Sequence, residues 1–402
     1  MQIRNNYSIL RDSCNVGLFV PFILCFIWPF GGLLMALVTV FNRTHNSNRE
    51  LVYLIVSLSF FLAYINTTKI ATSDTIHYLS WYNNIDRSDP INSFLYYKGS
   101  YSISEPFFAI ISIVISYLTF GSEIGYLFFC TFIMYFLQFY AIFIVARKYE
   151  IRKIYIVYLL LMLAFVNPLF IQSVHALRQM LAAAFFMLAL AYRIVYARNC
   201  WGVIVASFLT HMSVMVYLPL ALLPMCYKEL TMRRVWMVGG IVTILVISSN
   251  FIGSLLGGME SEILSAAGDK IIQSMDHNQM SLQLRGFYMY NIPFLVVTLL
   301  SIFSNKGKYP ELSVYYYLYI ITFLIVVLNP ISTEVSIRYA FFVFSFFQYS
   351  FLSYILTNRR NARIVVKIFT TLLVLTFFWL LAGDATYASL SSILFKLFPF
   401  IL

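Results

Sequence analysis

The chain has 402 residues, of which 61% are hydrophobic and only 11% are charged, and its mean hydropathy is +0.82. Soluble domains are about half apolar and about a quarter charged, so this composition excludes a soluble globular enzyme. Most of the outer surface must face lipid, because so few charges cannot coat a soluble particle of this size. The net charge of +11 then belongs to loops that orient a membrane protein, and we predict no nucleic-acid partner.

Apolar runs of about 18 to 25 residues recur along the chain, long enough to cross the hydrocarbon as helices, whereas barrel strands would be about half as long. The first run lacks a small-residue cleavage pattern and is predicted to be a retained span. We predict an all-α polytopic integral membrane protein, a single domain over residues 1–402 with about 11–13 membrane helices. The predicted segments are 17–41, 51–66, 105–120, 124–146, 154–171, 177–195, 201–226, 235–257, 286–304, 312–331, 337–356, 364–383 and a weaker 385–402.

Six basic connectors between these segments hold most of the 27 lysines and arginines. If all six are cytoplasmic, the two long polar loops, 67–104 and 258–285, are both periplasmic. Segments 105–120 and 201–226 would then begin and end on the same side, so we predict that each is re-entrant, interfacial or broken. Alternatively, both are ordinary spans and a few loops lie on the disfavoured side. No inverted repeat relates the two halves, which weakens a secondary-transporter interpretation.

The sequence lacks the common metal and cofactor motifs. The five histidines form no HxxxH or HExxH pair, and there is no DxD, GxSxG, P-loop or GxGxxG. The five cysteines are scattered without a CxxC and are interpreted as packing residues. We therefore predict no metal and no cofactor.

Arg178 opens an Ala-rich apolar segment, between His175 and Gln179. A cation at a helix N-terminus opposes the helix dipole at a cost of about 0.3–1 kcal/mol, unless an anion occupies the same place. Free backbone N–H groups beside a guanidinium suit a phosphate or diphosphate. The alternative is an arginine that reaches up to the outer headgroups.

The first long polar loop carries Asp74, Tyr78 and Tyr82 at i, i+4, i+8 spacing, with His77 beside them and Lys69 just before. On a helix these three side chains would share one face. A carboxylate next to aromatic rings is a common arrangement for holding a sugar. The alternative is an interfacial helix whose aromatic residues anchor in the headgroups.

Further polar residues interrupt the later apolar segments. His211 either satisfies a neighbouring carbonyl or faces the same cavity as Arg178 as a proton carrier. Glu334 and Arg338 stand four apart, as an internal ion pair or as the source of a second cation for a diphosphate. Arg285, at the end of the second long loop, is a third candidate cation.

The order and spacing of these polar and aromatic residues, together with the Glu105-Pro106 pair, extend over residues 50–345. They resemble the EpsG family and, more broadly, Wzy-type polysaccharide polymerases. Two positions depart from the family: Lys69 stands where it usually has arginine, and Thr75 where an aromatic residue usually follows the aspartate. The matching positions are Lys69, Asp74, Tyr78, Tyr82, Glu105-Pro106, Arg178-Gln179-Met180-Leu181-Ala182, His211-Met212-Ser213 and Arg338-Tyr339.

The resemblance implies a glycosyltransferase of the bacterial inner membrane that joins undecaprenyl-diphosphate-linked oligosaccharides into O-antigen or exopolysaccharide at the periplasmic side. The lipid carrier would be the leaving group, no cofactor or nucleotide sugar would be needed, and a chain-length regulator protein is a candidate partner. A lipid-linked oligosaccharide flippase or other transporter and an O-antigen ligase are the alternatives. The predicted catalytic residues are Asp74, His77, Arg178 and His211, and the predicted substrate-binding residues are Lys69, Tyr78, Tyr82, His175, Gln179, Arg285, Glu334, Arg338 and Tyr339.

Overall fold

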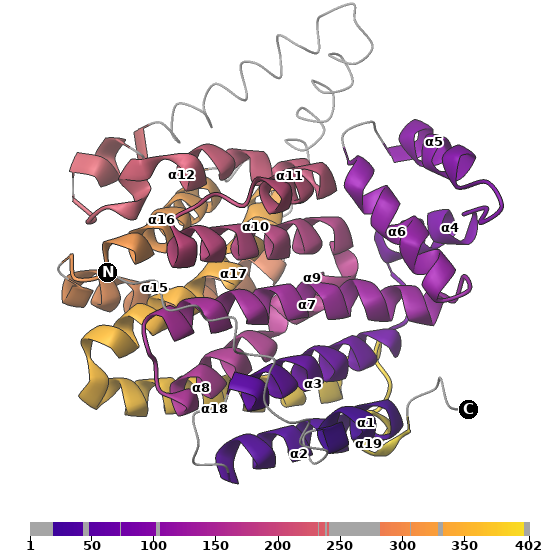
Figure 1. Cartoon of the computed structure of the whole chain (residues 1–402), viewed down its shortest axis with the longest axis horizontal. Helices are drawn as coiled ribbons and strands as arrows, with labels where there is room; N and C mark the ends of the chain where they lie inside the picture. Colours follow the sequence, from indigo (N-terminus) through magenta and orange to yellow (C-terminus); the bar gives the residue numbers. More distant parts are fainter. Residues whose placement is uncertain are drawn as a thin grey trace, which may run out of the picture.

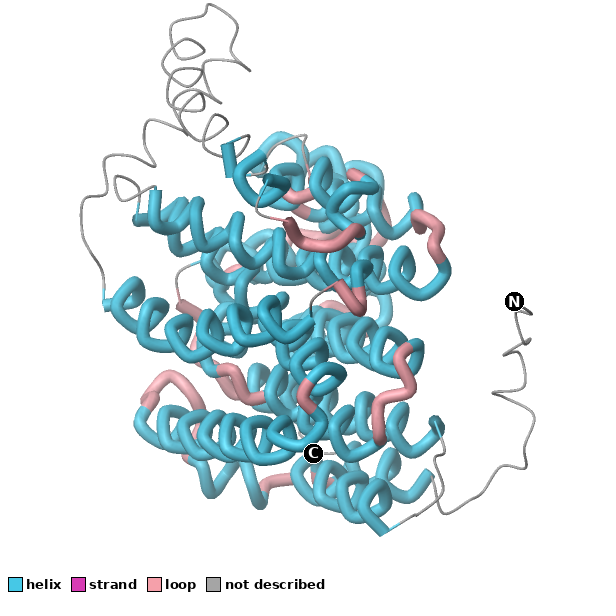
Figure 2. The backbone as a smooth tube through the Cα atoms, turned by 90° about the vertical axis from the view of Figure 1, so that its left-hand side faces the viewer, coloured by secondary structure: helices cyan, strands magenta, loops and turns pink. Residues whose placement is uncertain are grey.

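The computed structural model is a bundle of helices joined by short connections (Figures 1 and 2). It describes residues 19–42, 48–72, 74–101, 105–231, 233–237, 239–240, 282–305, 307–328 and 333–397, and no strand occurs in these ranges. The helices are α1 (Phe19–Ile27), α2 (Pro29–Asn42), α3 (Asn48–Thr67), α4 (Asp74–Asn83), α5 (Pro90–Tyr101), α6 (Pro106–Leu118), α7 (Glu123–Lys148), α8 (Lys153–Ala164), α9 (Asn167–His175), α10 (Leu177–Tyr196), α11 (Trp201–Thr210), η3 (Met212–Val216), α12 (Leu218–Leu222), η4 (Pro224–Tyr227), α15 (Leu282–Asn305), η5 (Pro310–Leu312), α16 (Ser313–Leu328), α17 (Thr333–Thr357), α18 (Arg359–Gly383) and α19 (Leu390–Phe395).

Four helices of the described part are long and apolar enough to cross a membrane: α3, α7, α10 and, over Asn361–Gly383, α18. The pair α8 and α9 becomes a fifth candidate if it is counted as one span bent by 53°. Pro168 in the first turn of α9 accounts for the bend, because proline donates no backbone hydrogen bond and fits a helix start. The chain is a polytopic all-α membrane protein, as its composition predicted.

Two contacts align the helix ends. Lys148, the last residue of α7, donates to the Ile194 carbonyl near the end of α10 at 2.6 Å. Lys153, the first residue of α8, forms an ion pair with Glu50 in the first turn of α3. The basic helix ends therefore lie together at one end of the bundle. The end of α3 and the start of α10 lie at the opposite end, which we call the α10-start end. Figure 1 shows α4, α5 and α6 grouped beyond this end.

The centre of the bundle packs tightly around α10, which contacts α7 on one side and α11 on the other. Ala182, Ala183 and Ala184 are completely buried. Ser207 of α11 donates to the Ala182 carbonyl at 2.7 Å, so the two backbones approach closely. Small residues permit such approaches in a membrane, where helices gain little from hydrophobic burial.

The two segments predicted to be unusual are indeed not simple helices. Segment 105–120 contains only the 13-residue α6, which is shorter than the roughly 20 residues of a spanning helix. Segment 201–226 breaks at His211, whose extended backbone ends α11 and begins η3. The structure therefore forms neither segment as a single long helix.

Other boundaries differ from the sequence prediction. Segment 17–41 is divided at Trp28 into α1 and α2. The polar stretch 67–104 folds largely into α4 and α5, so it is not an extended loop. Within 385–402, the short α19 packs beside α2, and the Trp28 indole donates to the Leu394 carbonyl at 2.6 Å. Most of the second predicted loop, 258–281, lies outside the described residues.

The Glu50–Lys153 pair yields a stability prediction, because Glu50 is 1% exposed and a buried charge without its partner is costly. We expect Lys153→Met to lower the free energy of unfolding by about 3–5 kcal/mol. The double variant Glu50→Met/Lys153→Met should recover most of that loss. Thermal unfolding in one detergent compares the variants. A double variant as unstable as Lys153→Met would contradict the explanation.

Candidate functional site

The break between α9 and α10 presents Arg178 to a polar cluster. Ala176, with φ −118° and ψ 50°, leaves the helical conformation, and α10 begins at Leu177. Arg178 therefore lies in the first turn of α10, as the sequence predicted. Its guanidinium faces the positive end of the helix dipole, so an anion is needed nearby.

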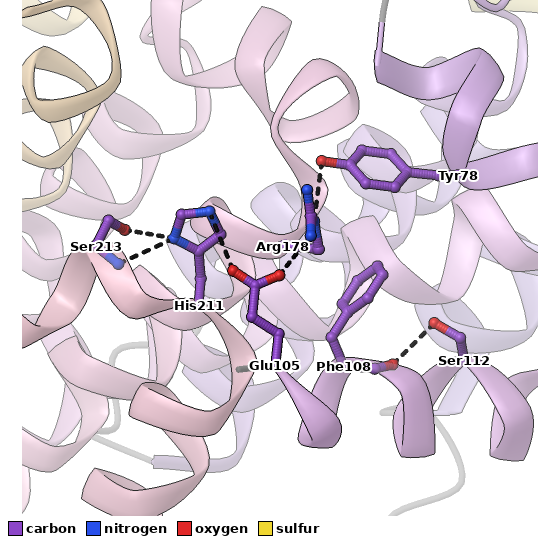
Figure 3. Close-up of polar contacts among 7 residues, drawn as sticks. All are labelled: Tyr78, Glu105, Phe108, Ser112, Arg178, His211 and Ser213. Atoms are coloured by element: carbon purple, nitrogen blue, oxygen red, sulfur yellow. Dashed lines mark hydrogen bonds and ion pairs between the residues drawn. The ribbon is translucent and has the colours of Figure 1, made fainter. Parts of the chain in front are cut away.

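That anion is Glu105, immediately before Pro106 at the start of α6. Arg178 Nη1 donates to Glu105 Oε2, and the Glu105 side chain is buried, with 8% of its surface exposed. The carboxylate lies between the N-terminal ends of two helices, α6 and α10, where the backbone dipoles favour a negative charge. Figure 3 shows Glu105 between Arg178 and His211.

His211 approaches the other carboxylate oxygen, with His211 Nε2 3.5 Å from Glu105 Oε1. The opposite ring nitrogen, Nδ1, accepts the Ser213 backbone N–H at 3.1 Å and lies 2.8 Å from Ser213 Oγ. Because Nδ1 accepts a backbone proton, the neutral ring carries its own proton on Nε2, toward Glu105. The turn that interrupts the apolar run thus sets the tautomer of His211.

Tyr78 completes this group of five residues, Tyr78, Glu105, Arg178, His211 and Ser213, which we call the Glu105 cluster (Figure 3). Arg178 Nε donates to the Tyr78 hydroxyl at 3.4 Å, and Arg178 Cζ lies 5.4 Å from the centre of the ring. Burial raises the pKa of Tyr78 above its ordinary value, and the neighbouring Arg178 charge lowers it only in part. The phenol therefore remains protonated at neutral pH.

Of the other predicted residues of α4, one packs in the core and two are exposed. Tyr82 packs inward, where its hydroxyl lies 2.6 Å from Thr119 Oγ1 and its ring stacks on Tyr126 at 4.1 Å. Its predicted role in holding a sugar stays a prediction. Asp74 and His77 have exposed side chains, and the charge of Asp74 acts on both Tyr78 and His175. Thr75 of the same helix donates to the Val174 carbonyl at 3.1 Å, which fixes α4 against α9.

Lys69 and His175 form a second polar group beside the first, with Lys69 Nζ 2.8 Å from His175 Nε2. The Lys69 ammonium also lies 5.0 Å from the centre of the Tyr387 ring. Burial lowers the pKa of Lys69 to about 8, although the charge of Asp384 opposes the shift. Two predicted binding residues thus meet two C-terminal residues that sequence reasoning did not select.

The remaining predicted residues are placed as follows. Gln179 is buried in α10. Tyr339 packs in an aromatic group, with ring centres 6.1 Å from Tyr217 and 6.4 Å from Phe342. Arg285 lies in α15 and Glu334 and Arg338 in α17, but their side chains lie outside the described part of the structure. Their predicted roles stay predictions.

No three His, Cys, Asp or Glu side chains of the described residues gather in a group that could hold a metal ion. The polar atoms of the Glu105 cluster are instead a carboxylate, a guanidinium, an imidazole and a phenol. These groups can accept and donate protons and can bind an anion. Such a set suits acid–base or group-transfer chemistry at a buried site.

The helical bundle, with several helices long and apolar enough to cross a membrane and a buried polar cluster at one end, defines the class of a polytopic membrane protein. Within this class, the chain matches the model of the EpsG family over residues 51–399, and it belongs to that family. The family supports a membrane protein of polysaccharide biosynthesis, of the polymerase type. No curated protein and no solved structure matches the chain.

Glu105 is the residue of the cluster to which the sequence analysis assigns no role. It enters that analysis only as part of the Glu105-Pro106 pair before an apolar segment. The available signal was a charge directly before a helix-starting proline, at the edge of a segment too short to span a membrane. Arg178 lies 73 residues away, so the pairing became evident only in the folded chain.

The lowered pKa of Lys69 predicts a pH-dependent stability. Between pH 8 and 10.5 the unfolded chain holds the Lys69 proton and the folded chain does not, so folding becomes more favourable as pH rises. Below pH 8 the buried charge lowers stability by about 1.4 kcal/mol for each unit of the shift. We expect Lys69→Met to be more stable than wild type at pH 7 and this difference to shrink by pH 10. Equal differences at both pH values, by thermal unfolding, would contradict a buried charged lysine.

Proposed function

We propose that this protein is a polysaccharide polymerase, a glycosyltransferase that joins lipid-diphosphate-linked repeat units. The observation that carries the proposal is the buried ion pair of Glu105 and Arg178 with His211 beside it. A polysaccharide polymerase of the membrane needs one group to accept a hydroxyl proton and another to stabilise a departing diphosphate. The cluster supplies both kinds of group.

The distribution of charge supports one orientation of the helical bundle in the membrane. Basic helix ends gather around Lys148, Lys153 and Arg193, and positive segments favour the cytoplasmic side. The Glu105 cluster lies at the opposite, α10-start end of the bundle. We infer that the site faces the periplasm of a bacterial inner membrane, where lipid-linked repeat units are joined.

In the proposed reaction, the hydroxyl oxygen of the acceptor sugar forms a bond to the anomeric carbon of the donor sugar. The bond from that carbon to the diphosphate oxygen breaks, and its electron pair leaves with the undecaprenyl diphosphate. The acceptor proton passes to the Glu105 carboxylate, which His211 and Arg178 hold in place. Positioned proton transfer of this kind contributes about 10²- to 10⁴-fold to a rate.

Arg178 has the electrostatic role. Its guanidinium lies at the start of α10, where backbone N–H groups also point outward, and together they suit the charge that develops on the leaving diphosphate. The neutral Tyr78 hydroxyl accepts a hydrogen bond from Arg178 Nε and keeps the guanidinium in place. Preorganised donors of this kind are often worth about 3–4 kcal/mol to a transition state.

In this proposal Glu105 acts as the base in place of Asp74, His77 and His211, the titratable residues that the sequence predicts to be catalytic. Asp74 and His77 are exposed on α4, whereas Glu105 is buried in contact with Arg178. Glycosyl transfer needs a group that accepts the proton of the acceptor hydroxyl, and transport does not. The buried carboxylate therefore favours the polymerase over the flippase.

The proposal is tested in a host deleted for this gene and complemented with variants. Arg178→Ala should leave core polysaccharide with a single repeat unit, because the leaving group loses its stabilising charge. Glu105→Gln should do the same, with a rate lower by about 10²- to 10⁴-fold. Gels of surface polysaccharide show the ladder, and immunoblots check that each variant reaches the membrane.

Matched controls are Arg198→Ala and Glu150→Gln, which change the same residue types at exposed positions. Both should restore a full ladder. A normal ladder in Arg178→Ala would refute the proposed role of Arg178. Loss of every repeat unit from the core in the deletion host would point instead to a flippase or an O-antigen ligase.

A further inference from the structure

A cavity lies at the α10-start end, between α9 and the last turns of α18. Its volume is about 540 Å³, within the range of about 300–1,000 Å³ typical of small-molecule sites. We call it the α18 cavity. The residues that line it include Asn167, Phe170, Trp379, Gly383, Asp384 and Tyr387.

Asp384 brings a fixed carboxylate to this cavity directly after α18 ends. Its Oδ1 atom accepts from the Thr386 backbone N–H at 2.9 Å and from Thr386 Oγ1 at 2.7 Å. Thr386 in turn is held to the segment after α3, because its carbonyl accepts from Ile70 N–H at 2.8 Å. None of the described residues donates to Oδ2, which leaves this oxygen for a ligand.

A second polar side chain lines the cavity beside Asp384. The side-chain amide of Asn167, in the first turn of α9, is half-buried and makes no hydrogen bond within the described part of the chain. The Tyr387 hydroxyl is buried near Tyr135, so Tyr387 offers the cavity its ring and not its hydroxyl. The cavity thus offers a carboxylate oxygen and an amide to a hydrogen-bonding ligand.

Aromatic rings form the rest of the wall. Phe170 and Tyr387 lie with ring centres 5.6 Å apart, and Trp379 is 75% exposed on α18. The exposed Trp379 ring beside a carboxylate and an amide suits a sugar, with its apolar face on the ring and its hydroxyls on the polar atoms.

The position of the cavity relates it to the Glu105 cluster. Behind it, Lys69 contacts both the Tyr387 ring and His175, the last residue of α9. Arg178 of the Glu105 cluster follows His175 by three residues, across the break at Ala176. The two sites therefore occupy neighbouring positions around one helix break.

We propose that the α18 cavity binds a saccharide unit of the acceptor substrate, while the Glu105 cluster acts on the donor diphosphate. This inference rests on the proposed function and specifies its substrate. Among the described residues, no lysine or arginine lines the cavity to balance a diphosphate beside Asp384, whereas the Glu105 cluster has Arg178. A polyprenyl tail would leave the Asp384 carboxylate and the Asn167 amide unpaired, whereas sugar hydroxyls satisfy them.

Gly383 allows a direct test of occupancy. A Cβ atom added there meets no other atom within 4 Å, so a larger side chain extends from α18 without displacing the fold. We expect Gly383→Trp to obstruct the cavity. Gly202→Trp is the matched control, because Gly202 of α11 is equally open and lies outside the cavity.

The probe is the lipid-free repeat-unit oligosaccharide released from the host polysaccharide, and saturation-transfer NMR on purified full-length protein in detergent measures its binding. Wild type, Gly202→Trp and Arg178→Ala should bind it alike. Gly383→Trp should lose binding, and Asp384→Asn should weaken it roughly tenfold through the lost charge-assisted hydrogen bond. Unchanged binding in Gly383→Trp would overturn the proposal.

Competition separates the other possible ligands. Neither inorganic diphosphate nor farnesol should displace the oligosaccharide, and displacement by either would assign the cavity to the diphosphate or to the lipid tail. The ladder in Arg178→Ala tests the polymerase separately. If that ladder is normal while Gly383→Trp still abolishes oligosaccharide binding, the proposed function fails and the saccharide site stands.

Discussion

The buried carboxylate of Glu105 is the constraint on which the rest of the site depends. A carboxylate removed from water must be compensated by charges and hydrogen bonds. Here the compensation comes from the Arg178 guanidinium, from His211 and from the starts of α6 and α10. Each lies on a different element, so the need to satisfy one charge holds α6, α10 and the turn after α11 together.

Breaks in helices supply the polar atoms. Pro168 bends α8 away from α9, Ala176 separates α9 from α10, and His211 ends α11. In a membrane, irregular backbone is tolerated only where protein or a polar cavity surrounds it. The breaks next to the Glu105 cluster meet this condition, because His211 and Arg178 turn their side chains toward one another across Glu105 (Figure 3). The interruptions of the apolar pattern are therefore the places where the polar side chains of the cluster meet.

The arrangement of polar groups around the α9–α10 break suits a reaction with two substrates. On one side, the Glu105 cluster combines a proton acceptor with a cation for an anionic leaving group. On the other, Asp384 and Tyr387 border a cavity of the size of a small-molecule site. Transfer between two sugars requires both to be held close together, and that positioning itself lowers the barrier of a bimolecular reaction. Membership of the EpsG family agrees with this interpretation.

The sequence by itself determined the membrane class, a helix start next to Arg178 and the break at His211, because hydropathy, proline positions and polar interruptions act over a few residues. Only the tertiary structure decided what these residues contact. Glu105 meets Arg178 across 73 residues, and Lys69 lies against Tyr387 near the opposite end of the chain. Helical spacing placed Tyr82 on the face of Tyr78, but packing against Tyr126 made it a core residue. Local patterns set where helices begin and end, whereas long-range pairing depends on how the helices pack.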